Sequence, residues 1–192
     1  MRIVAPAISL LLSTASAACM LIDAPEPPGM ESTVDEHETT AQLDAGAVLA
    51  AIGDGAYRTS AAFTHATKTP YPSAAVSGAW VDEWVSTSSY AVYSQVRPDQ
   101  LGSSVTLPVG TTVVRVVTDD AGTPTELTLM VKGPAGYNPA LGDWWFGVTD
   151  PSGKPATTDA GAEMGLLTGC YGCHVPRNGD DYLFGVPVDD RP

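Results

Sequence analysis

The sequence predicts a mainly β domain of the α+β class, built on an antiparallel sheet with one or two short helices. Residues 111–118 are a run of valine and threonine, which favour strands. The Asp-Asp-Ala-Gly turn at 119–122 follows, and apolar residues alternate with others over 127–131, so the two segments predict a hairpin. Residues 143–149 are rich in aromatic side chains and predict a further strand.

Weaker patterns predict the remaining elements. The Ala- and Leu-rich segment 45–52 predicts a short helix that ends at Gly53 or Gly55. Residues 79–86 fit either a strand or the start of a helix, and residues 90–96 fit an amphipathic element. Two further elements are expected near the end of the chain, namely a turn at 150–153 and a short strand at 182–184.

The first 18 residues have the composition of a signal peptide. Arg2 precedes an apolar run at 3–12 that is too short to cross a bilayer, and small residues follow at 13–18. We therefore expect the protein to be exported, with residues 1–18 removed.

Cys19 follows these small residues and leaves two interpretations open. Ser16-Ala17-Ala18-Cys19 resembles a bacterial lipoprotein signal, in which the cysteine is acylated and becomes the mature N-terminus. This interpretation predicts a periplasmic or outer-membrane lipoprotein whose only membrane contact is that lipid. Cleavage after Ala17 would instead leave a soluble exported protein with one spare thiol.

Residues 19–44 are acidic, contain prolines and have no Lys or Arg. They predict a disordered tether ahead of a single folded domain at 45–192. The whole chain has a formal net charge of -13 and a pI near 4.3. Such a charge argues against nucleic acid and anionic membrane surfaces as partners.

The motif Cys170-Tyr171-Gly172-Cys173-His174 carries the main functional prediction. Two cysteines three positions apart, with a histidine directly after the second, form the pattern that attaches haem c. The two thiols bond to the two vinyl groups of the porphyrin, and the histidine becomes the proximal ligand of the iron. Cys170, Cys173 and His174 are therefore the predicted haem-binding residues, with His174 as the metal ligand.

Three other interpretations of the cysteine pair are weaker. A thioredoxin-like dithiol would follow an early strand, whereas this pair comes late in the chain. A structural zinc site needs four ligands, and the remaining candidates, Cys19, His37 and His65, lie far upstream. A disulfide stays open for an exported protein but gives no role to His174.

The position of the motif narrows the class of haem protein. Small electron-transfer cytochromes carry the motif early and a methionine ligand late, but no Met, His or Lys follows His174. A four-helix cytochrome also carries its motif late, yet the predicted hairpin contradicts a helical bundle. Any sixth protein ligand would have to come from upstream.

Several short segments resemble the cytochrome P-460 and cytochrome c′-beta family and occur in its order. These segments are Leu107-Pro108-Val109-Gly110-Thr111 with Val113-Val114-Arg115, then Met130-Val131-Lys132, Gly136-Tyr137-Asn138-Pro139, Gly142-Asp143-Trp144-Trp145, Asp150-x-x-Gly153-Lys154, and the haem motif followed by Asp181-Tyr182-Leu183-Phe184-Gly185. The resemblance covers about residues 80–186.

The resemblance implies a five-coordinate haem c in a β-sheet domain that is often a homodimer, with His174 proximal and an open distal face. Family members divide by chemistry. Cytochrome P-460 has a lysine cross-linked to the porphyrin and oxidises hydroxylamine, whereas cytochrome c′-beta binds nitric oxide. This chain has Arg115 in the strand where we expect that lysine, and arginine stays protonated and does not form the link.

Other residues near the predicted strands are secondary candidates for the site. Lys132 is the alternative cross-linking lysine, Glu83 and Glu126 are candidate proton acceptors, and Met130 and His65 are candidate sixth ligands, although each also fits an ordinary structural place. Aromatic packing around the porphyrin is expected of Trp144, Trp145 and Tyr182, and pairing with a haem propionate of Arg177.

Three functional hypotheses follow. The first is an exported c-type cytochrome with one covalent haem, acting in electron transfer or in binding a small ligand such as nitric oxide. The second is a haem enzyme that oxidises hydroxylamine. The third is a secreted β domain without haem, with Cys170 and Cys173 in a disulfide. The first is favoured because the haem motif is specific and the lysine assignment is not.

Overall fold

A computed structural model describes residues 43–192. The predicted signal peptide, Cys19 and nearly all of the predicted tether lie outside the described residues. The helices are α1 (Ala45–Ile52), α2 (Tyr90–Tyr93) and α3 (Tyr171–His174). The strands are β1 (Phe63–His65), β2 (Tyr71–Pro72), β3 (Trp80–Ser86), β4 (Thr112–Thr118), β5 (Pro124–Lys132), β6 (Trp144–Thr149), β7 (Thr157–Thr158), β8 (Gly161–Ala162) and β9 (Met164–Gly165).

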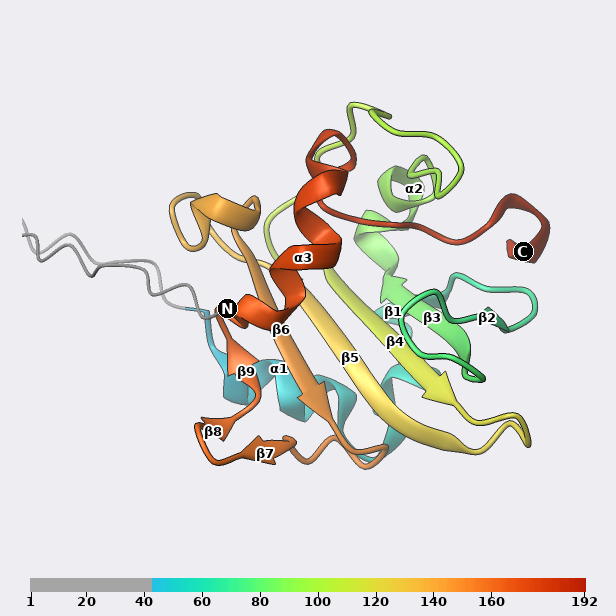
Figure 1. The fold of residues 1–192 in the computed structure, drawn as a ribbon, viewed down its shortest axis with the longest axis vertical. Coiled ribbons are helices and arrows are strands. Elements are labelled where there is room, and N and C mark those ends of the chain that lie inside the picture. The colour runs from blue at the N-terminus through green and yellow to red at the C-terminus, as the bar shows by residue number, and fades with distance from the viewer. Residues whose placement is uncertain (1–42) are drawn as a thin grey trace, which may run out of the picture. The chain divides into compact units, whose positions relative to one another are not determined.

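The fold is α+β and mainly β, built on one antiparallel sheet of seven strands (Figure 1). The strand order is β1-β3-β4-β5-β6-β9, and β2 pairs with β3 beside β1. The strands β7 and β8 form a separate small ribbon. The sheet therefore follows chain order through its centre, as expected for strands joined by short connections.

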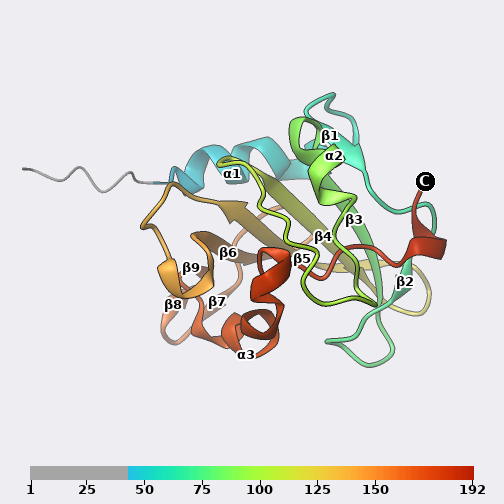
Figure 2. The ribbon, with the colours of Figure 1, turned by 90° about the horizontal axis from the view of Figure 1, so that it is seen from above.

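The sheet has a front face and a rear face, which we define by one row of paired residues each. The front row is Val85, Val113, Met130 and Phe146, and the rear row is Trp84, Val114, Leu129 and Gly147. The helix α1 packs against the rear face, and α3 lies over the front face, as two perpendicular views agree (Figures 1 and 2). Each face thus has its own core of buried apolar side chains, which is what alternating strands require when both faces are covered.

The predicted first helix and the predicted hairpin are confirmed. The helix α1 has the predicted bounds and ends at Gly53, and the Oδ1 of Asp44 accepts a hydrogen bond from the Ala47 N–H at its start. The β4–β5 hairpin turns through the predicted segment, where Asp119 accepts hydrogen bonds from two backbone N–H groups and Gly122 has a φ of 80°. Of the two alternatives for residues 79–86, the strand is the correct one, and it is β3, which spans 80–86.

Two predictions are wrong. Residues 182–184 form no strand, because Asp181 and Tyr182 both have left-handed backbone, with φ of 52° and 63°, which turns the chain out of an extended course. The described residues contain three short helices rather than one or two, since the third helix lies within the Cys170–His174 motif. No helix within residues 43–192 is long and apolar enough to span a bilayer.

Candidate functional site

The motif lies in a continuous helical segment on the front face. A 3₁₀ turn at Thr168–Cys170 leads into α3, and a second 3₁₀ segment, Val175–Asp180, follows it. Cys170 and Cys173 are three positions apart in this segment, so their side chains point to the same side. Both thiols are free; Cys170 packs against the front core and Cys173 is exposed.

His174 is held by its surroundings in one orientation. Its Nδ1 lies 2.7 Å from the carbonyl oxygen of Tyr182, which can only accept, so Nδ1 carries the proton and Nε2 keeps its lone pair. The rings of Phe146 and Phe184 meet the imidazole edge-on, with centroid distances of 5.3 and 5.2 Å. His174 therefore presents an unprotonated Nε2, the form in which histidine binds a metal.

Burial lowers the pKa of His174 below its ordinary value. The hydrogen bond to Tyr182 acts in the opposite direction, and the positive charge of Arg115 adds to the lowering. The imidazole is consequently neutral at pH 7. Burial also raises the pKa of Cys170, so this thiol stays protonated.

The Asp181–Tyr182 segment that supplies the carbonyl is itself fixed by buried contacts. Asp181 accepts hydrogen bonds from Lys132 Nζ at 2.5 Å and from the Leu107 N–H at 2.7 Å, and its own carbonyl accepts from Trp144 Nε1 at 2.8 Å. The ring of Tyr182 packs on Gly142, where a Cβ would lie 2.5 Å from it. A strained turn after the 3₁₀ segment Val175–Asp180 is thus held in place from β5 and β6.

A buried polar cluster occupies the front face on β3 and β4. The carboxylate of Glu83 accepts hydrogen bonds from the hydroxyl groups of Tyr71 and Tyr93, and Arg115 Nε lies 3.9 Å from one of its oxygens. Burial first, and the Glu83 charge second, raise the pKa of both tyrosines. Both phenols are therefore neutral donors. Arg115 pairs with Glu83 in register, so two opposite charges share an inward row of adjacent strands.

Arg115 has unused hydrogen-bonding capacity. Its Nε is buried with no hydrogen-bond partner among residues 43–192, and its only hydrogen bond there is a long one, 3.4 Å, to the Ser73 hydroxyl. The next residues in its front-face row, Thr128 and Val148, are only half-buried. A guanidinium with free donors beside a partly open stretch of sheet is suited to binding an anion.

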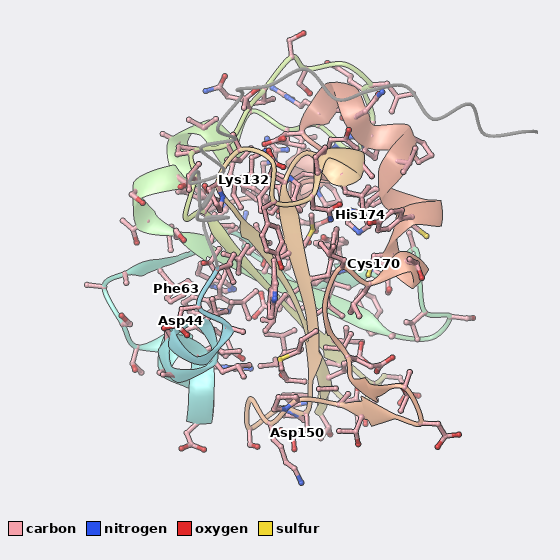
Figure 3. The ribbon with its side chains drawn as sticks, turned by 90° about the vertical axis from the view of Figure 1, so that its left-hand side faces the viewer. Asp44, Phe63, Lys132, Asp150, Cys170 and His174 are labelled. Atoms are coloured by element: carbon pink, nitrogen blue, oxygen red, sulfur yellow. The ribbon has the colours of Figure 1, made fainter. Side chains whose placement is uncertain are left out.

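The structure separates the other predicted candidates. His65 is exposed on the rear side, stacked on Trp84 at 4.3 Å and bonded to Asp82 at 2.6 Å, so the sheet lies between it and His174. Figure 3 shows the two sides, with Cys170 and His174 on one and Asp44 and Phe63 on the other. Met130 is on the front face but is packed in the core with 9% exposure.

Lys132 forms an ion pair with Asp181, and the two side chains are 9% and 6% exposed. Its Nζ also lies 5.1 Å from the centre of the Trp144 ring. It is therefore not the solvated lysine of a strand edge. Arg177 likewise uses its guanidinium internally, on the carbonyls of Leu183, Pro98 and Arg97. Neither cation is free for a haem group.

The remaining candidates divide between the two faces. Trp144 is fully buried on the front face, whereas Trp145 belongs to the rear core and does not face the motif. Glu126 is half-buried on the front face, where burial and then Glu163 raise its pKa. Among residues 43–192 no three His, Cys, Asp or Glu side chains come together as a metal site.

Comparisons of this chain with protein-family models, with curated proteins and with solved structures found no match. The functional assignment therefore depends on the chain's own residues and their geometry.

Sequence reasoning missed the partners that complete the site. Tyr71 and Tyr93 were not predicted to bind Glu83, and Asp181 was not predicted to bind Lys132. The sequence did offer one signal for such partners, namely a charged residue at an inward position of an alternating strand. A charge at that position needs a buried partner.

Proposed function

We propose that residues 43–192 form a haem c domain in which Cys170 and Cys173 hold the porphyrin and His174 Nε2 binds the iron. The proposal is carried by one observation: an imidazole whose Nδ1 is bound to the Tyr182 carbonyl lies on the same helical turn as two free thiols. Each thiol would add across one vinyl group of the porphyrin, so that a sulfur–carbon bond would form and the thiol hydrogen would move to the other vinyl carbon without net oxidation.

The chain's own residues support this assignment chemically. The neutral His174 needs no deprotonation to bind, and Phe146 and Phe184 fix the plane of its ring. Arg115 is the residue we assign to a haem propionate, because its guanidinium is partly exposed and makes only one long hydrogen bond and a 3.9 Å ion pair with Glu83 within the described residues. Haem, when bound, supplies an iron that exchanges one electron and takes a small ligand.

The protein is proposed to be an exported c-type cytochrome of the P-460 and c′-beta type, active in electron transfer or in binding a ligand such as nitric oxide. An open sixth position is supported by the places of the candidate ligands. His65 lies on the rear side and Met130 is packed in the core. Its partners would be a redox protein or the small ligand itself, and the homodimer and the lipid on Cys19 remain part of the proposal.

The hydroxylamine-oxidising alternative is less well supported. It requires a lysine bonded to the porphyrin, but Lys132 is held in its ion pair and β4 carries Arg115. Each carboxylate oxygen of the buried Glu83 already accepts a hydrogen bond from a tyrosine hydroxyl. We therefore favour ligand binding or electron transfer.

The direct test is expression of the full chain in the periplasm together with a c-type maturation system. We expect the intact mass to include one haem, and the ferrous spectrum to be that of ordinary haem c, without a red-shifted Soret band. Cys170→Ser with Cys173→Ser should abolish the added mass. Cys19→Ser is the matched control, because it should remove any lipid mass and leave the haem.

His174→Ala tests the axial ligand separately. It should keep the covalent haem and lose the wild-type spectrum, and added imidazole should restore it. A colourless wild-type protein with both motif thiols free or joined in a disulfide would overturn the proposal.

A further inference from the structure

We infer that Lys132 and Asp181 are positioning residues that hold the Tyr182 carbonyl against His174 Nδ1 and thereby set how strongly His174 donates to iron. The inference rests on the proposed haem function. It gives a role to a buried ion pair that lies outside the motif and touches neither thiol.

Asp181 is held through its side chain and its carbonyl alike. Its two carboxylate oxygens bind Lys132 Nζ and the Leu107 N–H, and its carbonyl accepts from Trp144 Nε1. The pair is desolvated, so its charges attract each other more strongly than on the surface. Trp144 is fully buried, so the third contact is as rigid as the core.

The backbone conformation of Asp181 and Tyr182 is unfavourable by itself and needs contacts that stabilise it. Asp181 and Tyr182 are consecutive residues with positive φ, and only aspartate of the two tolerates that conformation well. Without the contacts to Asp181, the segment would relax toward ordinary φ values. Any such change moves the carbonyl of Tyr182, the next residue in the chain.

The carbonyl of Tyr182 is the hydrogen-bonded link from this segment to the imidazole. It accepts the Nδ1 hydrogen bond at 2.7 Å, while the Tyr182 N–H donates to the Arg177 carbonyl at 2.8 Å. A strong Nδ1–H···O=C bond gives a proximal histidine more imidazolate character, which favours ferric iron. Loosening the contacts of Asp181 should therefore weaken the iron–histidine bond and raise the reduction potential.

The experiment uses the haem-loaded full chain with Lys132→Met, Asp181→Asn and the two together. Each single change leaves one buried charge without its partner and can destabilise the fold. The double variant leaves none, and the asparagine that replaces Asp181 still tolerates a positive φ and can accept from the Leu107 N–H. Haem content, reduction potential and the iron–histidine stretching frequency of the ferrous protein are measured for each.

We expect the double variant to keep its haem while the stretching frequency falls and the potential rises. Gly142→Ala should shift both in the same directions by another route, because the new Cβ pushes on the Tyr182 ring. Lys154→Met changes an exposed lysine in the same way and should shift neither. A double variant with the wild-type frequency and potential would overturn the inference.

A second readout separates this inference from the proposed function. In haem-free protein, the Nδ1–H resonance of His174 should be protected from exchange with water in the wild type and lose that protection in the double variant. Equal protection in both would overturn the inference whether or not haem binds. Absence of haem from the matured wild type would overturn the proposed function alone.

Discussion

At the scale of single residues, the two nitrogens of His174 have different tasks. Nδ1 donates to a backbone carbonyl that cannot be removed by mutation, and Nε2 is left for a metal. This division also determines how the haem-free protein responds to acid. The buried imidazole binds a proton less readily than it would in the unfolded chain.

We predict that the haem-free protein loses stability as the pH falls below about 6.5, the ordinary pKa of histidine. The pKa of His174 is lowered on folding, so in this range the unfolded state binds more protons and acid favours it. The slope of the unfolding free energy for one proton is at most about 1.4 kcal/mol per pH unit. Urea titrations at several pH values measure it.

His174→Gln is the matched variant, because it removes the titrating group and keeps a polar side chain. The slope should disappear in this variant. A slope of the same size in His174→Gln would show that another group carries the pH dependence.

The residues of the site that are close together in the sequence could be predicted from it, and the residues that are far apart could not. Cys170, Cys173 and His174 lie within five positions, in the spacing that the proposed haem attachment would require. Lys132 and Asp181 are 49 positions apart, and the residue that they place contributes a backbone carbonyl. No pattern of residue types marks a carbonyl, so this half of the site needed the fold.

At the scale of elements, the small helix α2 is joined to the sheet by one buried hydrogen bond. Tyr93 donates from α2 to Glu83 on β3, and no water competes because both side chains are buried. We predict that Tyr93→Phe lowers the unfolding free energy by about 2 kcal/mol, since a buried carboxylate loses one of two donors. Chemical denaturation measures the loss.

Tyr90→Phe is the control from the same helix. The Tyr90 hydroxyl makes no hydrogen bond within residues 43–192, although its ring packs against the same core. Its removal should change stability by less than about 0.5 kcal/mol. Equal losses in the two variants would mean that ring packing, and not the bond to Glu83, joins α2 to the sheet.

Elements were predictable where local signals agreed. Helix α1 and the β4–β5 hairpin have a cap, a turn glycine or a β-branched run within their own segments. The edge strands β1 and β2 are three and two residues long, which is too short to show an alternation of apolar and polar residues. They are strands only because they pair with β3. Residues 182–184 had strand-like composition, but the contacts of Asp181 impose a turn.

At the scale of the whole molecule, the negative net charge and the positive charge of Arg115 have opposite effects on the approach of a charged redox reagent. The formal net charge is -13, yet the positive charge of Arg115 lies close enough to His174 to lower its pKa. Long-range attraction depends on the total charge at low salt, and only nearby charges act once the Debye length falls to about 8 Å at physiological ionic strength. Ionic strength therefore distinguishes the two contributions.

If the domain carries haem as proposed, we predict that it exchanges electrons faster with a cationic metal complex, such as a ruthenium hexaammine, than with anionic hexacyanoferrate at low salt. The difference should be about tenfold or more and should shrink as salt is added, because the net charge is screened. Stopped-flow rates over a salt series measure it. If the anionic reagent is the faster one at low salt, Arg115 dominates the approach to the haem, and Arg115→Gln should then reverse the order.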